Sequence, residues 1–152
     1  AAKFSEFYLL AAEAAVKGAS GSMSARDLVN VLRARAGKWV WSVSGNAPKI
    51  QDNSAAMVAA TPSVITIDYI LAERSREYFG EGYRWFDLVR TQTWAQKSAT
   101  YSIGGVNYGN HTPQTVTRNI QNFHYLRPIP QGQLDAMEVS ADVKAKYQNP
   151  GY

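Results

Sequence analysis

The chain has 152 residues, of which 16 are basic and 12 acidic, giving a formal net charge of +4. This length suits one ordinary domain with its own core, and a composition that is 45% hydrophobic excludes a disordered or fibrous chain. Cysteine is absent, which excludes disulfides, thiol nucleophiles and cysteine-ligated metals, and the scattered basic residues do not indicate a nucleic-acid partner.

Residues 1–37 predict a helical hairpin. Apolar positions recur at three- and four-residue steps from Phe4 to about Lys17 and predict a first helix. We expect its buried face to hold Phe4, Phe7, Tyr8, Ala11, Ala14 and Ala15. The capping pair Ser24 and Asp27 predicts a second helix that ends at Gly37. The helical spacing of this second helix is carried by Leu28, Val31, Leu32 and Arg35.

One hairpin cannot bury both of its faces. Either the later segment covers it, or neighbouring hairpins of the same kind lie upstream, as in solenoid repeats.

Residues 38–63 show no helical period and are interrupted by Gly, Asn, Pro and Ser, so we expect a long loop, which is commonly functional in a compact domain. Trp39 and Trp41 alternate with Val40 and predict a short strand with both indoles on one face. The two indoles are expected either to enter the core or to line a ligand surface.

Residues 64–94 predict two further helices. Thr66 is expected to cap the first, with a buried face of Ile67, Ile70, Leu71 and Tyr78. Gly80 and Gly82 break this helix, and a second runs from near Tyr83 to about Arg90.

The last third of the chain changes character. Residues 101–108 alternate around Gly104-Gly105 and predict a β-hairpin, residues 115–120 alternate weakly, and residues 123–130 are expected to be extended because of their prolines. A short helix is predicted over 131–137, and the final residues from Tyr147 are expected to lie in a groove.

The sequence offers little catalytic chemistry. Glu73 and Glu77 lie one helical turn apart, but Arg76 and Arg74 stand at contact spacing, which predicts an ion-pair network with both carboxylates ionised. His111 and His124 have no metal-ligand spacing, and no serine-nucleophile or phosphate-loop motif is present. We expect no enzymatic activity, no cofactor and no metal.

The segment ERSREYFGEGYRWFDLVR, here called the signature block, resembles the signature of SusD/RagB-type outer-membrane nutrient-binding lipoproteins. The family pattern is E-R-x-x-E followed by E-G-x-R-W-F-D-L-x-R. It is matched by Glu73, Arg74, Glu77, Glu81, Gly82, Arg84, Trp85, Phe86, Asp87, Leu88 and Arg90.

Three other parts of the chain extend the resemblance. Pro128-Ile129-Pro130-Gln131 with Leu134-Asp135 is similar to the family's P-I-P-Q-x-x-L/I-D. The ending Gln148-Asn149-Pro150-Gly151-Tyr152 is similar to its Q-N-P-G-Y/W. The opening YLLAAEAA…LVNVLRARAG looks like its last tetratricopeptide-type hairpin.

The resemblance implies a mostly α-helical fold, with a tetratricopeptide-like hairpin, further helices, long irregular loops and at most a small β-hairpin. Residues 1–152 are expected to form one carboxy-terminal domain of a longer protein whose amino-terminal portion is absent. Its parts would be the last hairpin (1–37), a loop (38–63), the signature helices (64–94), and loops with a short helix and a docked tail (95–152).

The resemblance also implies a function. Family members sit on the outer face of the outer membrane of Bacteroidetes-type bacteria, held by a lipidated amino-terminal cysteine that this chain lacks. They bind oligosaccharides or other nutrients for a TonB-dependent, SusC-like transporter, without catalysis. Within the family the matched motifs look structural, so none of the matched residues is expected to contact ligand.

Ligand contacts are expected from loop aromatics, because the apolar face of a sugar ring stacks on an indole or phenol. The candidates are Trp39, Trp41 and Tyr108, with Trp94 and Tyr101 behind them. A rival hypothesis is a tetratricopeptide-like scaffold that grips a protein. A glycosidase using Glu73 and Glu77 would require both carboxylates to face a cleft without an arginine partner.

Overall fold

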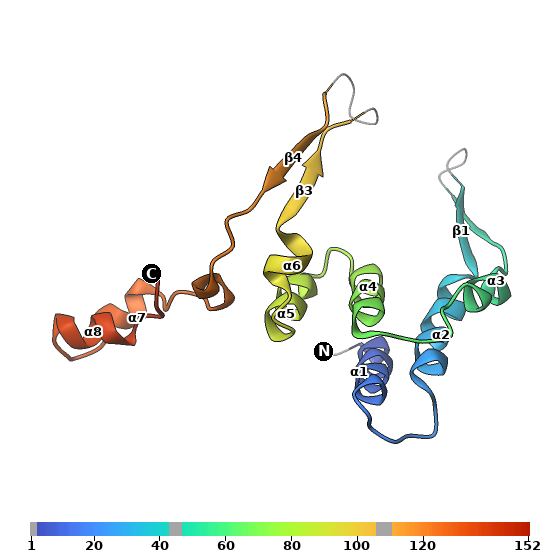
Figure 1. Cartoon of the computed structure of the whole chain (residues 1–152), viewed down its shortest axis with the longest axis horizontal. Helices are drawn as coiled ribbons and strands as arrows, with labels where there is room; N and C mark the ends of the chain where they lie inside the picture. The colour runs from blue at the N-terminus through green and yellow to red at the C-terminus, as the bar shows by residue number, and fades with distance from the viewer. Residues whose placement is uncertain (1–2, 43–46, 106–110) are drawn as a thin grey trace. The chain divides into compact units, whose positions relative to one another are not determined.

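The computed structural model describes residues 3–42, 47–105 and 111–152, with the backbone alone given for 39–42 and 47–50 (Figure 1). Within these ranges it contains eight α-helices and two separate two-stranded antiparallel sheets. The prediction of a mostly α-helical fold is confirmed, and two β-hairpins are present where at most one is predicted. The contacts group the chain into two compact units, Ala1–Arg84 and Trp85–Tyr152.

The helices and strands follow one another in the order drawn in Figure 1. The first unit holds α1 (Phe4–Val16), α2 (Ala25–Ala36), β1 (Trp39–Ser42), β2 (Ala47–Ile50), α3 (Ser54–Ala59) and α4 (Ile67–Glu77), and α5 (Tyr83–Arg90) spans the boundary. The second unit continues with α6 (Trp94–Ser98), β3 (Thr100–Ile103), β4 (Gln114–Thr117), a 3-10 helix (Asn122–Tyr125), α7 (Gln131–Asp135) and α8 (Ala141–Tyr147).

The predicted helical hairpin is confirmed. Tyr8 packs against the core as predicted, but the prediction of burial is wrong for Phe4, Phe7, Ala11 and Ala14. Phe4 and Phe7 are 73% and 58% exposed, whereas Leu9 and Ala12 are fully buried. The helix is apolar on nearly every side, so its periodicity alone does not select a face. The small side chain of Ala12 lets the partner helices approach, and the Phe4 side of α1 is left open.

The second helix begins as predicted and also packs through a different set of side chains. Ser24 and Asp27 form a reciprocal capping box, in which the Asp27 N–H donates to the Ser24 hydroxyl at 3.1 Å. Leu32 is buried as expected, but Val31 is exposed and Val29 takes its place in the core.

One core joins α1, α2 and α4. The Thr66 hydroxyl caps α4 by accepting from the Tyr69 N–H at 3.1 Å, as predicted. The expected face of α4 is confirmed for Ile70, Leu71 and Tyr78, and Ile67 is half-buried. The core cluster consists of Leu9, Ala12, Val29, Leu32, Ile65, Ile70 and Tyr78.

The described parts of residues 38–63 form two strands and a helix, where the sequence predicts a loop. The strand predicted at Trp39–Trp41 is confirmed as β1, which pairs with β2 in the register Trp39 to Ile50. The prediction that this stretch contains no helix is wrong, because α3 follows β2. Gly37 allows α3 to pack against the end of α2, since an added Cβ would lie 2.8 Å from Met57 Cγ and 2.9 Å from Ser54 Cα.

The second unit differs from prediction in its strands. β3 pairs with β4, with Ile103 opposite Gln114, so the partner of residues 100–103 is 114–117 and the hairpin predicted within 101–108 is wrong. Gly104 and Gly105 follow β3 with φ of 80° and 114°, which glycine adopts without strain.

Short helices account for the other differences in this unit. The helix predicted at 131–137 is confirmed as α7, whereas α6 and α8 are not predicted. Residues 122–125 form a 3-10 turn, and the extended backbone expected from residue 123 begins only at Leu126. None of the described helices is long and apolar enough to cross a lipid bilayer.

Two neighbouring leucines test the face of α1 that the core selects. Leu9→Ala removes a fully buried side chain and should lower the free energy of unfolding by about 2–5 kcal/mol. Leu10→Ala, the matched control, removes a side chain that is 46% exposed and should cost less than half as much. Urea denaturation of both variants measures the difference, and equal losses would contradict the assigned face.

Candidate functional site

The carboxylate of Glu73 holds the centre of an ion-pair network in the first unit. Its Oε1 atom accepts from Arg33 Nη1 of α2 and from Arg76 Nη2 one turn along α4, both at 2.6 Å. The side chains of Glu73 and Arg33 are only 10% and 12% exposed. Burial by itself raises the pKa of Glu73, but the hydrogen bonds from Arg76 and Arg33 outweigh it and hold that pKa below its ordinary value.

Arg33 extends this network to α3. Its Nε donates to the Thr61 hydroxyl at 2.8 Å, and its Nη2 donates to the Met57 carbonyl at 3.2 Å. Thr61 in turn donates to Asn30 Oδ1 at 2.7 Å. One guanidinium therefore links α2, the end of α3 and α4 through charge-assisted hydrogen bonds.

The second predicted carboxylate also has an arginine partner. Glu77 accepts from Arg35 Nη2 at 2.6 Å, and Arg74 lies 3.7 Å from Glu6 and 5.3 Å from the centre of the Tyr78 ring. The condition for a glycosidase, two carboxylates without arginine partners, is therefore not met. The cavity that Glu73 and Glu77 share measures about 120 Å³, below the roughly 300 Å³ at which ligand pockets begin.

Aromatic rings organise the second unit around Trp94. Its ring centre lies 6.2 Å from that of Trp85 and 5.8 Å from that of Tyr125, with near-perpendicular edge contacts in both pairs. The Arg127 guanidinium lies 4.4 Å from the centre of the Trp85 ring. The Tyr125 hydroxyl accepts from the Ala95 N–H at 3.0 Å, which fixes the start of α6 against this cluster.

The other residues of the signature block have separate surroundings. Asp87 is buried and accepts from Arg90 Nε at 3.1 Å, while Arg84 donates to the Leu71 carbonyl at 3.3 Å. Gly82 has φ of 80°, which suits glycine after the end of α4. Phe86 is 54% exposed.

The proposed ligand aromatics fall in three places. Trp39 and Trp41 lie on β1, but their side chains are outside the described residues, as is the whole of Tyr108. Tyr101 lies on β3, with the Arg118 guanidinium 3.9 Å from its ring centre. Among the candidates whose side chains the structure describes, Tyr101 lies against Arg118 and Trp94 against Trp85, His124 and Tyr125.

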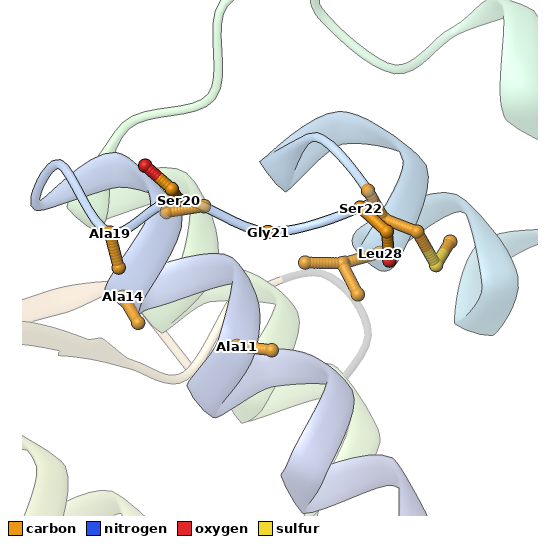
Figure 2. Close-up of a pocket in the computed structure, with 9 residues that line it drawn as sticks. Ala11, Ala14, Ala19, Ser20, Gly21, Ser22 and Leu28 are labelled. Carbon is orange, nitrogen blue, oxygen red and sulfur yellow. The ribbon is translucent and has the colours of Figure 1, made fainter.

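The described residues line several cavities that were not predicted, among them the following two. One, of about 250 Å³, lies where the α1–α2 connection meets the hairpin; Figure 2 shows Ala11 and Ala14 of α1 and Leu28 of α2 bordering it, beside Ser20, Gly21 and Ser22. Its lining is small and mostly apolar, with little hydrogen-bonding chemistry to orient a ligand.

The other cavity is an open cleft of about 540 Å³ in the second unit. Its lining is uncharged and consists of Ile120, Gln121, Asn122, Phe123, Leu126, Pro150 and Gly151. The sequence could have indicated part of this cleft, because the amides Gln121 and Asn122 stand next to Phe123. That Pro150 and Gly151 also line it is visible only in the folded chain. In the part of the chain that the structure describes, no group of three or more acidic or histidine side chains is placed to hold a metal ion.

The geometry of Glu73 predicts a pH-dependent stability. Glu73→Gln leaves Arg33 without its buried anion and should lower the free energy of unfolding at pH 7 by about 3 kcal/mol. Because the pKa of Glu73 is lowered in the folded state, its contribution is complete above about pH 4.5 and is lost as pH falls through the lowered pKa. Urea titrations at several pH values should show the gap to the wild type closing only in that acidic window.

Glu77→Gln serves as the matched control, because its partner Arg35 is 55% exposed and the pair is screened by water. Its cost should stay below about 1 kcal/mol. If both variants lower the free energy of unfolding equally, the buried Glu73–Arg33 pair stabilises the fold no more than the exposed Glu77–Arg35 pair.

Trp85 provides a second test, within the aromatic cluster. Trp85→Ala removes the edge contact with Trp94 and the surface on which Arg127 lies, and should lower the free energy of unfolding by about 3–5 kcal/mol. Phe86→Ala, a neighbouring exposed aromatic, is the control for ring loss alone. A thermal shift near zero for Trp85→Ala would contradict a structural role for the block.

The chain matches a known protein family over almost its whole length. The model of the SusD family matches residues 3–152, which include the helical hairpin, the signature block and the docked tail. No curated protein matches the chain. Because the family match extends over almost every residue, the chain belongs to the SusD family.

Proposed function

We propose that this chain is part of a cell-surface protein that binds oligosaccharides and passes them to a SusC-like TonB-dependent transporter. The observation that carries the proposal is the family match over residues 3–152. Proteins of the SusD family are non-catalytic binding proteins for nutrients, and are typically surface-exposed outer-membrane lipoproteins. Attachment to the outer membrane through an amino-terminal lipid belongs to the same proposal.

The ion pairs support binding without chemistry. A general acid needs a carboxyl group that stays protonated near neutral pH, whereas the partners of Glu73 favour its ionised form. The arginines that surround both carboxylates instead connect the helices of the first unit. We further propose that the signature residues serve the fold and do not contact ligand: Glu73, Arg74, Glu77, Gly82, Arg84, Trp85, Phe86, Asp87 and Arg90.

The ligand surface is proposed to include Trp39, Trp41 and Tyr108. Because a β-strand alternates its residues between two faces, the sequence predicts that Trp39 and Trp41 of β1 lie on the same face. Two indoles on one face of a two-stranded ribbon suit stacking against successive sugar rings. Trp94 is a weaker candidate, because its ring packs among Trp85, His124 and Tyr125.

A protein-binding scaffold is the second candidate function. It is favoured by one observation, the open apolar side of α1, where Phe4, Phe7 and Leu10 are all exposed. Such a side on a tetratricopeptide-like hairpin suits the packing of another helix.

Removal of the two indoles tests the glycan proposal. We expect the double variant Trp39→Ala with Trp41→Ala to lose retention in affinity electrophoresis on immobilised oligosaccharides, with a nearly unchanged melting temperature. The matched control is Trp94→Ala, which should lower the melting temperature instead.

Two results would count against this assignment. If the double variant unfolds, the indoles belong to the core and the ligand site lies elsewhere. If the wild-type chain is retained by none of a broad panel of glycans but captures an amphipathic helix through the Phe4 side, the scaffold function replaces the glycan proposal.

A further inference from the structure

The final residues of the chain are held in a way that resembles a bound peptide. Gln148 pairs with the backbone of Ile129, accepting from its N–H at Oε1 (2.8 Å) and donating from Nε2 to its carbonyl (3.1 Å). One side-chain amide thus imitates the two hydrogen bonds that a neighbouring strand would make.

The sequence around Ile129 explains why this pairing is selective. Pro128 and Pro130 have no backbone N–H, so Ile129 supplies the one backbone donor of the Pro-Ile-Pro segment. A glutamine reaches both the donor and the neighbouring acceptor at once, whereas a glutamate would lack the N–H₂ group that donates to the carbonyl.

Two other side chains of the tail bind backbone carbonyls that precede the Pro-Ile-Pro segment. Asn149 Nδ2 donates to the Arg127 carbonyl at 2.5 Å, and the Tyr152 hydroxyl donates to the Leu126 carbonyl at 3.0 Å. The backbone carbonyls of residues 126, 127 and 129, which follow the 3-10 helix, therefore accept from the side chains of Tyr152, Asn149 and Gln148.

A tight turn presents these side chains. The Tyr152 N–H donates to the Asn149 carbonyl at 3.3 Å, with Pro150 and Gly151 in the central positions and Gly151 at φ of 97°. This is the pattern of a type II turn, which favours proline first and glycine second.

Gly151 also approaches Phe123 closely. A Cβ added at Gly151 would overlap the Phe123 ring and lie 2.7 Å from its Cβ, while the Tyr152 ring meets the Phe123 ring edge-on at 5.3 Å between centres. Glycine is therefore required by both conformation and space.

We propose that residues 123–129 form a recognition groove specific for the sequence Gln-Asn-Pro-Gly-Tyr, which the chain's own residues 148–152 fill, and that the emptied groove binds the same peptide in trans. Backbone carbonyls supply the affinity, and the Gln148, Gly151 and Tyr152 positions supply the selectivity. Because Pro150 and Gly151 also line the 540 Å³ cleft, filling the groove completes that cleft.

The experiment uses the full chain with its own tail weakened. Gly151→Ala is expected to empty the groove while leaving residues 123–129 unchanged, and Gln148→Ala is a second, sterically milder way to empty it. A fluorescent peptide of residues 145–152, Ala-Lys-Tyr-Gln-Asn-Pro-Gly-Tyr, is then titrated and followed by polarisation. Gly132→Ala is the matched control, because a Cβ at Gly132 meets nothing within 4 Å.

The peptide should bind both emptied chains at least ten-fold more tightly than the wild type or Gly132→Ala, whose linked tails compete at high effective concentration. A peptide carrying alanine in place of its glycine should bind at least ten-fold more weakly than the native peptide. The proposal is overturned if the native peptide binds neither emptied chain, binds the wild type equally well, or is matched by the alanine peptide.

Discussion

The first unit depends on one buried anion. The Glu73 carboxylate is shared by Arg33 and Arg76 at 2.6 Å, and Arg33 also donates to Thr61 and to the Met57 carbonyl. The apolar core lies between α1, α2 and α4, so it does not by itself fix α3. The guanidinium of Arg33 helps to do this through directional hydrogen bonds, at the cost of desolvating two charges, and Arg26 of α2 adds bonds to the Val58 and Thr61 carbonyls. These hydrogen bonds fix the position of α3. Because α3 directly follows the β1–β2 hairpin, they also hold the base of the hairpin that carries the proposed indoles.

Local sequence signals, each confined to a few residues, were sufficient to predict much of the secondary structure. Ser24 and Thr66 start α2 and α4 because a cap is a contact over three residues, which the sequence displays directly. The buried face of α1 is different, since Phe4, Leu9 and Ala12 are all apolar and only the shape of the facing helices selects among them. The short helices α6 and α8 lack a long enough period to be recognised, and the strand partner of β3 lies beyond an intervening segment.

The candidate site shows the same division. The spacing of Glu73 and Arg76 was sufficient to predict their pairing, but Arg33 is 40 residues away and joins them only because α2 packs beside α4. Similarly, the Gln148 amide finds Ile129 across two helices, α7 and α8. In each case both partners lie in a sequence motif, but the contact between the two motifs depends on the fold and cannot be predicted from their spacing in the sequence. The cleft beside Phe123 is only partly marked in the sequence, because two of its lining residues, Pro150 and Gly151, belong to the docked tail.

These contacts also constrain where ligand selection can occur. Glu73 is paired with Arg33 and Arg76, Trp85 lies against Arg127, and Gln148 bonds to the backbone of Ile129. A side chain that is held in this way is poorly free to follow a change of ligand. The segments between the motifs each contain a two-stranded hairpin, β1–β2 and β3–β4. A hairpin needs only its turn and ladder to persist, so its outward aromatics can vary at little cost in stability. A binding family that keeps its fold while changing its ligand therefore has most freedom in these two hairpins, and the aromatic residues Trp39 and Trp41 stand on the first of them.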